Sequence, residues 1–104
     1  MSFEQLRAFV TVAEEENLTR AARRLHISQP PLTRRIRSLE DELGTTLFER
    51  QPTGMRLLPA GDRLLVRARA ILDAVDAAAE ELRSGPRADG SSMRRDRSPG
   101  GLDT

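Results

Sequence analysis

A heptad repeat of apolar residues in the second half of the chain is the strongest constraint on its fold. Between residues 59 and 84, apolar positions are spaced alternately by four and three residues over nearly three heptads. This spacing puts them on one face of a helix, as in helices that pair with another helix. Pro59 suits the first turn of this helix, and Gly85 with Pro86 ends it. The repeat consists of Leu64, Ala68, Ile71, Val75, Ala78 and Leu82.

The helix expected over residues 59–84 is too long and too apolar for a small domain to cover alone. The chain has 104 residues, of which 38 % are hydrophobic, so it has room for one small core. We therefore expect this helix to pair with the same helix of a second chain, as a homodimer. The expected dimerisation residues are Leu64, Ala68, Ile71, Leu72, Val75 and Leu82.

Three shorter helical patterns precede the heptad repeat. The first begins at Ser2, three residues before Gln5, which is the spacing of a capping box. The second covers about residues 18–25. The third begins after Ser28, with two prolines in its first turn, and ends at Gly44. The residues that the third helix should bury are Leu32, Ile36, Leu39 and Leu43.

Residues 47–58 are predicted to form a small hairpin, because apolar residues bracket a turn that contains Pro52, Thr53 and Gly54. From residue 85 to 104 the chain is rich in Gly, Ser, Arg and Asp, which predicts disorder. The expected fold is therefore mainly α: a winged helix-turn-helix of three helices and a two-stranded wing over residues 1–58, a dimerisation helix over 59–84, and a disordered tail over 85–104.

Composition excludes several classes of site. The chain has no cysteine and one histidine, His26, which we assign to a turn; we therefore expect no metal site and no cofactor. We take the acidic run from Glu40 to Glu42 as a solvated helix end, because no nucleophile accompanies it, and we expect no enzyme. No segment is long and apolar enough for a membrane span, and no signal peptide is visible, so we expect a cytoplasmic protein.

Positive charge is concentrated in the middle of the chain. Residues 18–70 carry eleven Arg and five acidic residues, a net charge of +6, although the whole chain carries only +1. A polyanion is expected to bind there. The third helix begins with Gln29, Thr33 and Arg34, residue types that pair with base edges in the major groove. From spacing alone, an ordinary solvated helix face explains these residues equally well.

The order of several short blocks resembles the N-terminal domain of LysR-type transcriptional regulators. The blocks are Phe9 to Glu14, Leu18 to Pro30, Leu39 to Gly44, Leu47 to Arg50, and Leu57 to Gly61. The resemblance covers about residues 2–83. A helix-turn-helix pattern alone is a weak signal, whereas this ordered series, with Ser28-Gln29-Pro30 opening the third helix, is specific.

The resemblance implies a module that binds specific sequences of double-stranded DNA, with a linker helix that pairs antiparallel with its twin. Full-length members continue into an effector domain, so we expect no small-molecule effector site in this chain. The residues implied to face the major groove are Gln29, Pro30, Thr33 and Arg34. Those expected at the DNA backbone or the minor groove are Thr19, Arg20, Arg37, Arg50 and Arg56.

The sequence departs from the family pattern at four places. Pro31 replaces a small residue, Thr33 stands where Ser is common, and Leu58 replaces the usual N-capping Thr. The wing is also poor in basic residues. A second hypothesis stays open at this point: a truncated regulator could act on full-length partners through the linker helix, without reading DNA sequence itself.

Overall fold

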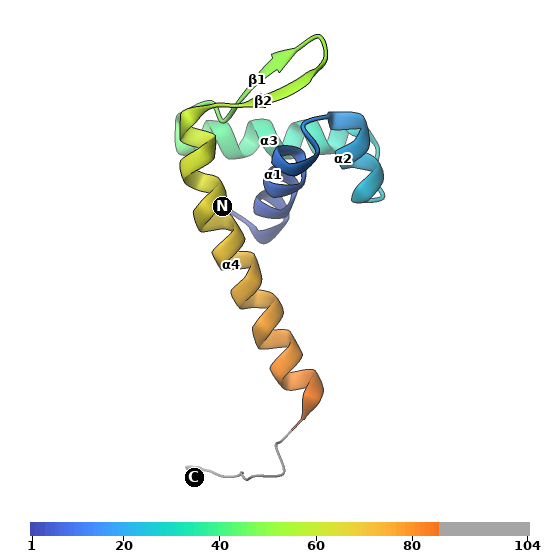
Figure 1. The fold of residues 1–104 in the computed structure, drawn as a ribbon, viewed down its shortest axis with the longest axis vertical. Coiled ribbons are helices and arrows are strands. Elements are labelled where there is room, and N and C mark those ends of the chain that lie inside the picture. The colour runs from blue at the N-terminus through green and yellow to red at the C-terminus, as the bar shows by residue number, and fades with distance from the viewer. Residues whose placement is uncertain (86–104) are drawn as a thin grey trace. The chain divides into compact units, whose positions relative to one another are not determined.

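The computed structural model describes residues 1–85 of the chain (Figure 1). The expected order of three helices, a hairpin and a long helix is confirmed. Apart from Gly85, the tail expected to be disordered lies outside the described residues. The elements are α1 (Phe3–Glu15), α2 (Leu18–Arg24), α3 (Gln29–Leu43), β1 (Phe48–Gln51), β2 (Gly54–Leu57) and α4 (Pro59–Ser84).

The chain divides into two compact units, of which the first spans Met1–Leu72. This unit contains the first three helices, the hairpin and the first half of α4. It therefore extends past residue 58, where the sequence predicted the domain boundary. The described part of the second unit is the remainder of α4 and Gly85. No helix in the described range is both long and apolar enough to span a lipid bilayer.

The core of the first unit lies where α1, α2 and α3 meet, with the hairpin and α4 packed against them. The rings of Phe9 in α1 and Phe48 in β1 meet with their centroids 5.4 Å apart and their planes tilted by 51°. Such aromatic pairs add about 0.5–1.5 kcal/mol beyond the area that they bury. The largest fully buried side chains are Phe9, Val12, Leu32, Leu39 and Leu47.

The ends of the helices follow the signals in the sequence. The capping box of α1 is present: the Gln5 N–H donates to Ser2 Oγ at 3.1 Å, and the Ser2 N–H donates to Gln5 Oε1 at 2.7 Å. Gly44 ends α3 in the left-handed conformation, with φ of 70°. Leu43, expected in the buried stripe of α3, is 37 % exposed because it lies on the last helical position.

The junction between α3, the hairpin and α4 is built from a carboxylate and a glycine. Glu40 Oε2 accepts the N–H groups of Leu47 at 2.7 Å and Phe48 at 3.3 Å, so it fixes the entry into β1. The expectation that Glu40 is part of a solvated helix end is therefore wrong. At Gly61 a Cβ would lie 2.5 Å from the Leu47 carbonyl oxygen and 2.4 Å from Leu57 Cδ1, so only glycine allows this approach.

Acidic residues at the end of α1 hold two other helices by ion pairs. Glu14 lies 2.9 Å from Arg24 in α2 and 3.0 Å from Arg69 in α4. Burial by itself would raise the pKa of Glu14, but the hydrogen bonds and charges of Arg24 and Arg69 hold it below its ordinary value. The hydrogen bond from Glu14 likewise raises the pKa of Arg24. These pairs offset the unfavourable position of the carboxylate at a helix C-terminus.

We predict that Glu14→Gln lowers the free energy of unfolding at neutral pH by about 1 kcal/mol, because two partly exposed ion pairs are lost. Since the pKa of Glu14 is lowered by folding, its stabilisation is complete above about pH 4.5 and is lost as the pH falls further. Urea unfolding at fixed protein concentration checks this. Asp41→Asn is the control, because Asp41 is exposed and has no ion-pair partner within residues 1–85. An equal acid dependence of Glu14→Gln and wild type would contradict the prediction.

Candidate nucleic-acid interface

The turn between α2 and α3 sets the direction in which α3 leaves the core. His26 adopts the left-handed conformation there, with φ of 59°. Its N–H donates to the Arg23 carbonyl at 3.1 Å, and the N–H of Ile27 donates to the Ala22 carbonyl at 3.0 Å. This is the Schellman pattern that ends many helices, with His in the place usually taken by Gly. His26 is therefore a turn residue, as the sequence indicated.

Ser28 precedes α3 in an extended backbone conformation, with φ of −80° and ψ of 169°. The side chain of Ser28 makes no capping hydrogen bond. A capping side chain accepts from the N–H of the second or third helical residue, and here these are Pro30 and Pro31, which have none. The two prolines therefore leave the Ser28 hydroxyl available to a ligand.

One face of α3 is open along its first two and a half turns. The burial of Leu32, Ile36 and Leu39 turns the opposite side of the helix to solvent. Four of the five side chains on the open face are exposed, and Thr33 is half-buried. We call this surface the α3 face: Gln29, Pro30, Thr33, Arg34 and Arg37.

A groove lies between α3 and the hairpin, and two arginines line it. Its volume is about 170 Å³, and Thr33, Arg37, Arg50 and Met55 are among its lining residues; we call it the wing groove. Arg37 and Arg50 are exposed and form no ion pair within residues 1–85. Glu40 also lines the groove, with its carboxylate bonded to the Leu47 and Phe48 amides, so two arginines and one acid leave the lining with a net positive charge.

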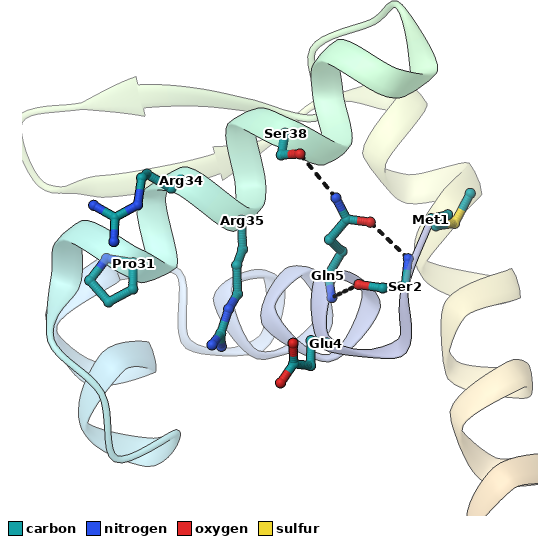
Figure 2. Close-up of a pocket in the computed structure, with 8 residues that line it drawn as sticks. All are labelled: Met1, Ser2, Glu4, Gln5, Pro31, Arg34, Arg35 and Ser38. Carbon is teal, nitrogen blue, oxygen red and sulfur yellow. Dashed lines mark hydrogen bonds between the residues drawn. The ribbon is translucent and has the colours of Figure 1, made fainter.

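A second, wider groove of about 590 Å³ lies between α3 and the start of α1 (Figure 2). Gln5 crosses it and donates from Nε2 to Ser38 Oγ at 3.2 Å. Figure 2 shows Arg35 directed from α3 toward α1, whereas Arg34 lies beside Pro31. Arg34 is exposed and has no ion-pair partner in the described part of the chain. Its guanidinium group is thus available to an external acceptor.

Two other arginines of the expected site are already engaged. Arg20 donates to the carbonyl of Glu15 at 2.7 Å, and its Nε lies 3.5 Å from the Glu15 carboxylate. Arg56 donates through Nε and Nη2 to Glu49 Oε1 at 3.0 and 2.7 Å. Glu49 and Arg56 are cross-strand partners, one position along from the pair of Arg50 and Met55. Because side chains alternate between faces of a hairpin, Arg56 lies on the face opposite to Arg50.

No pattern in the sequence indicates how the hairpin is anchored to α1. The N–H of Met55 donates to the Glu16 carbonyl at 3.0 Å, and Glu16 itself is left-handed, with φ of 58°. A Cβ on Gly54 would lie 2.3 Å from the same carbonyl oxygen. The sequence identified Gly54 only as a turn residue, whereas the structure makes it the contact point between the wing and α1.

The residues expected to pair two chains differ in how far the chain's own core buries them. Ala68 and Leu72 are buried in the chain's own core, and Leu64 is half-buried against it. Ile71 and Leu82 are 39 % and 83 % exposed, and Val75 is half-buried. The chain's own core therefore covers the first half of the repeat and leaves Ile71 and Leu82 exposed. Sequence analysis also missed Val66, which is 72 % exposed.

Comparison with known proteins identifies the family. Residues 3–62 match the model of the bacterial regulatory helix-turn-helix proteins of the lysR family. The chain belongs to the LysR family. Within residues 1–85, no group of three or more His, Cys, Asp and Glu side chains is placed to hold a metal ion.

Relatives of this LysR-family chain include regulators and solved DNA complexes. It is 58 % identical over 73 residues to the HTH-type transcriptional regulator TfdS of Cupriavidus pinatubonensis, a match over 70 % of this chain and 25 % of that protein. It resembles a crystal structure of the CbnR_DBD-DNA complex, with 44 % identity, a TM-score of 0.77, and coverage of 84 % of this chain and 100 % of that one. The BenM_DBD/catB site 1 DNA complex gives 39 % identity, a TM-score of 0.77, and coverage of 81 % and 94 %. The chain thus spans about a quarter of the length of TfdS.

We predict that Gly54→Ala displaces the wing from α1, because the added Cβ collides with the Glu16 carbonyl. Overpacking of this kind costs roughly 1–3 kcal/mol. Hydrogen exchange of the Met55 amide, which donates to that carbonyl, should become faster in the variant. Thr53→Ala, at the exposed tip of the hairpin, is the matched control. If the Met55 amide stays as protected in Gly54→Ala as in the control, the anchor is not where we place it.

Proposed function

We propose that this LysR-family chain binds specific sequences of double-stranded DNA, with the α3 face in the major groove. The observation that carries the proposal is the α3 face, where Gln29 and Arg34 are exposed and Thr33 is half-buried, next to two arginines without an ion-pair partner among residues 1–85. The solved relatives support it, since the CbnR and BenM domains are described as complexes with DNA. Because the relatives are transcriptional regulators, we infer that the chain is the DNA-reading part of a regulator.

Each side chain of the α3 face has a matching partner on DNA. The Arg34 guanidinium fits the O6 and N7 acceptors of guanine, and the Gln29 amide fits N6 and N7 of adenine. Pro30 and the methyl group of Thr33 offer apolar contacts to the methyl group of thymine. The role is binding rather than catalysis, and we place it in the cytoplasm, where bacterial DNA is.

The phosphate contacts are proposed from the charges that lack a partner. Arg37 and Arg50 line the wing groove and have no ion-pair partner in the described part of the chain, so we propose that they neutralise phosphates. Thr19 and Arg20, at the start of α2, are proposed to lie near the DNA backbone. Arg56 would have to exchange Glu49 for a phosphate or a minor-groove acceptor, so we expect a smaller contribution from it.

We predict that Arg34→Ala costs about 1–3 kcal/mol on the preferred duplex and relaxes the preference at one base pair. Arg37→Ala should weaken binding to all duplexes uniformly and reduce the slope of log affinity against log salt by about one. Fluorescence anisotropy at several salt concentrations, on duplexes with single base-pair changes, measures both effects. Arg83→Ala is the control, because Arg83 lies in the last turn of α4 and pairs with Glu80. Unchanged affinity and preference in Arg34→Ala would contradict the placement of α3.

We also propose that α4 pairs two copies of the chain through the side that the core leaves open. On that side, three exposed residues directly precede Ala68, Val75 and Leu82 of the heptad repeat. They are Arg67, Ala74 and Glu81. Arg67 and Glu81 have no ion-pair partner within residues 1–85. They stand seven residues before and after Ala74. The opposite flank holds Leu65 and Leu72, which pack on the chain's own core.

This placement favours an antiparallel pair. In an antiparallel pair centred near Ala74, Arg67 of each chain meets Glu81 of the other, which gives two symmetric ion pairs. In a parallel pair, Arg67 lies level with Arg67 and Glu81 with Glu81, so neither charge is matched. Charges beside the apolar repeat set partner choice and orientation in paired helices.

We predict that Arg67→Glu and Glu81→Arg each weaken the homodimer roughly tenfold, because two ion pairs become two repulsive pairs. Mixing the two variants, or combining them in one chain, should restore pairing to the wild-type level. Sedimentation equilibrium measures the dissociation constants, and Arg63→Glu, on the exposed surface near the start of α4, is the control. If the single variants pair as well as wild type, or if mixing restores nothing, the antiparallel arrangement is wrong.

A further inference from the structure

A hydrogen bond joins two side chains that the sequence assigned to different parts of the interface. Gln29 Nε2 donates to Thr19 Oγ1 at 2.8 Å. Gln29 is the first residue of α3, and Thr19 lies in the first turn of α2. Both side chains are exposed, so burial does not explain why they meet.

We propose that Thr19 is a positioning residue that fixes the side-chain amide of Gln29 for reading one base pair. The inference rests on the proposed function, since it concerns how the α3 face reads DNA. A free glutamine side chain can rotate its terminal amide and exchange the positions of its oxygen and nitrogen. The bond to Thr19 restricts the position of the Gln29 side chain before DNA is bound, so less ordering entropy is lost on binding.

The atoms left free by this bond match adenine. The amide has two N–H donors and one oxygen acceptor. With one N–H directed to Thr19, the other N–H and Oε1 remain, and adenine offers the complementary N7 acceptor and N6 donor. The rotated amide would present only its N–H donors, which suit the acceptors of guanine. Because a hydroxyl can accept from the amide N–H or donate to the amide oxygen, Thr19 selects the adenine-reading orientation when its own O–H is engaged by a phosphate.

Thr19 keeps one hydrogen-bonding group for the DNA backbone. Its Oγ1 accepts from Gln29, so its own O–H remains free to donate, and its exposure leaves that donor accessible. If this O–H donates to a DNA phosphate, the same Thr19 side chain both positions the protein along the DNA backbone and orients the Gln29 amide. A Thr19 that only contacts phosphate would instead affect all DNA sequences alike.

The test compares Thr19→Val, which keeps the shape but loses the acceptor, with Thr19→Ser, which keeps the hydroxyl. Gln29→Ala first identifies the base pair that Gln29 reads, on a set of duplexes in which every base pair of the wild-type site is changed singly. Thermal melting of each variant shows that it is folded. We expect Thr19→Val to lose roughly three- to tenfold of the preference at that same base pair, and not at others. Thr19→Ser should keep the preference. In a chain that already carries Gln29→Ala, adding Thr19→Val should cause no further loss of base preference.

Two results would overturn the inference while leaving DNA binding intact. One is a uniform loss of affinity in Thr19→Val across all duplexes, with the base preference unchanged, which would show a phosphate contact alone. The other is that Thr19→Val changes neither the affinity nor the preference at the base pair that Gln29 reads. A wild-type chain without any base preference would instead overturn the proposed function, and this inference with it.

Discussion

The burial of one stripe of α3 determines what the rest of the molecule can present to a ligand. Leu32, Ile36 and Leu39 are at most 3 % exposed, and a helix cannot bury them without turning its opposite side outward. That opposite side includes Pro30, Arg34 and Arg37, which are all exposed. Replacing one of the buried residues by Ala would cost about 2–5 kcal/mol and would also free α3 to rotate. The same buried contacts therefore stabilise the fold and determine which side of α3 faces solvent.

The two ends of α2 are held by backbone conformations that are unfavourable for their residues. Glu16, before α2, and His26, after it, are both left-handed, a state that favours glycine. The carbonyl of Glu16 accepts the N–H of Met55. After α2, the N–H groups of His26 and Ile27 donate to the carbonyls of Arg23 and Ala22. The hairpin is thus bonded to the C-terminal end of α1, just before α2, and α3 follows the turn that ends α2. The wing groove and the α3 face share Thr33 and Arg37, so the hairpin and α3 border one continuous surface.

Much of the fold could be predicted from the sequence, because its signals are local. The capping box at Ser2, the stop at Gly44 and the start of α4 at Pro59 depend on residues within one turn. The role of Glu40 and the anchor at Gly54 could not be predicted, since both depend on backbone groups brought close only by tertiary packing. The site showed the same limit. Residue types and family resemblance indicated the α3 face. Only the folded structure separates Arg50, which has no ion-pair partner among residues 1–85, from Arg56, which pairs with Glu49.

The central claim is that a pair of these chains reads a DNA sequence through α3. The most direct measurement is selection from a pool of random duplexes by the purified 104-residue chain at near-physiological salt. The account predicts enrichment of a palindrome with a fixed half-site spacing, because a symmetric dimer presents two α3 faces to successive major grooves. Binding that depends on salt but enriches no sequence would contradict it. In that case α4 would be the functional part of the chain, and the second hypothesis, action through partner chains, would be the better account.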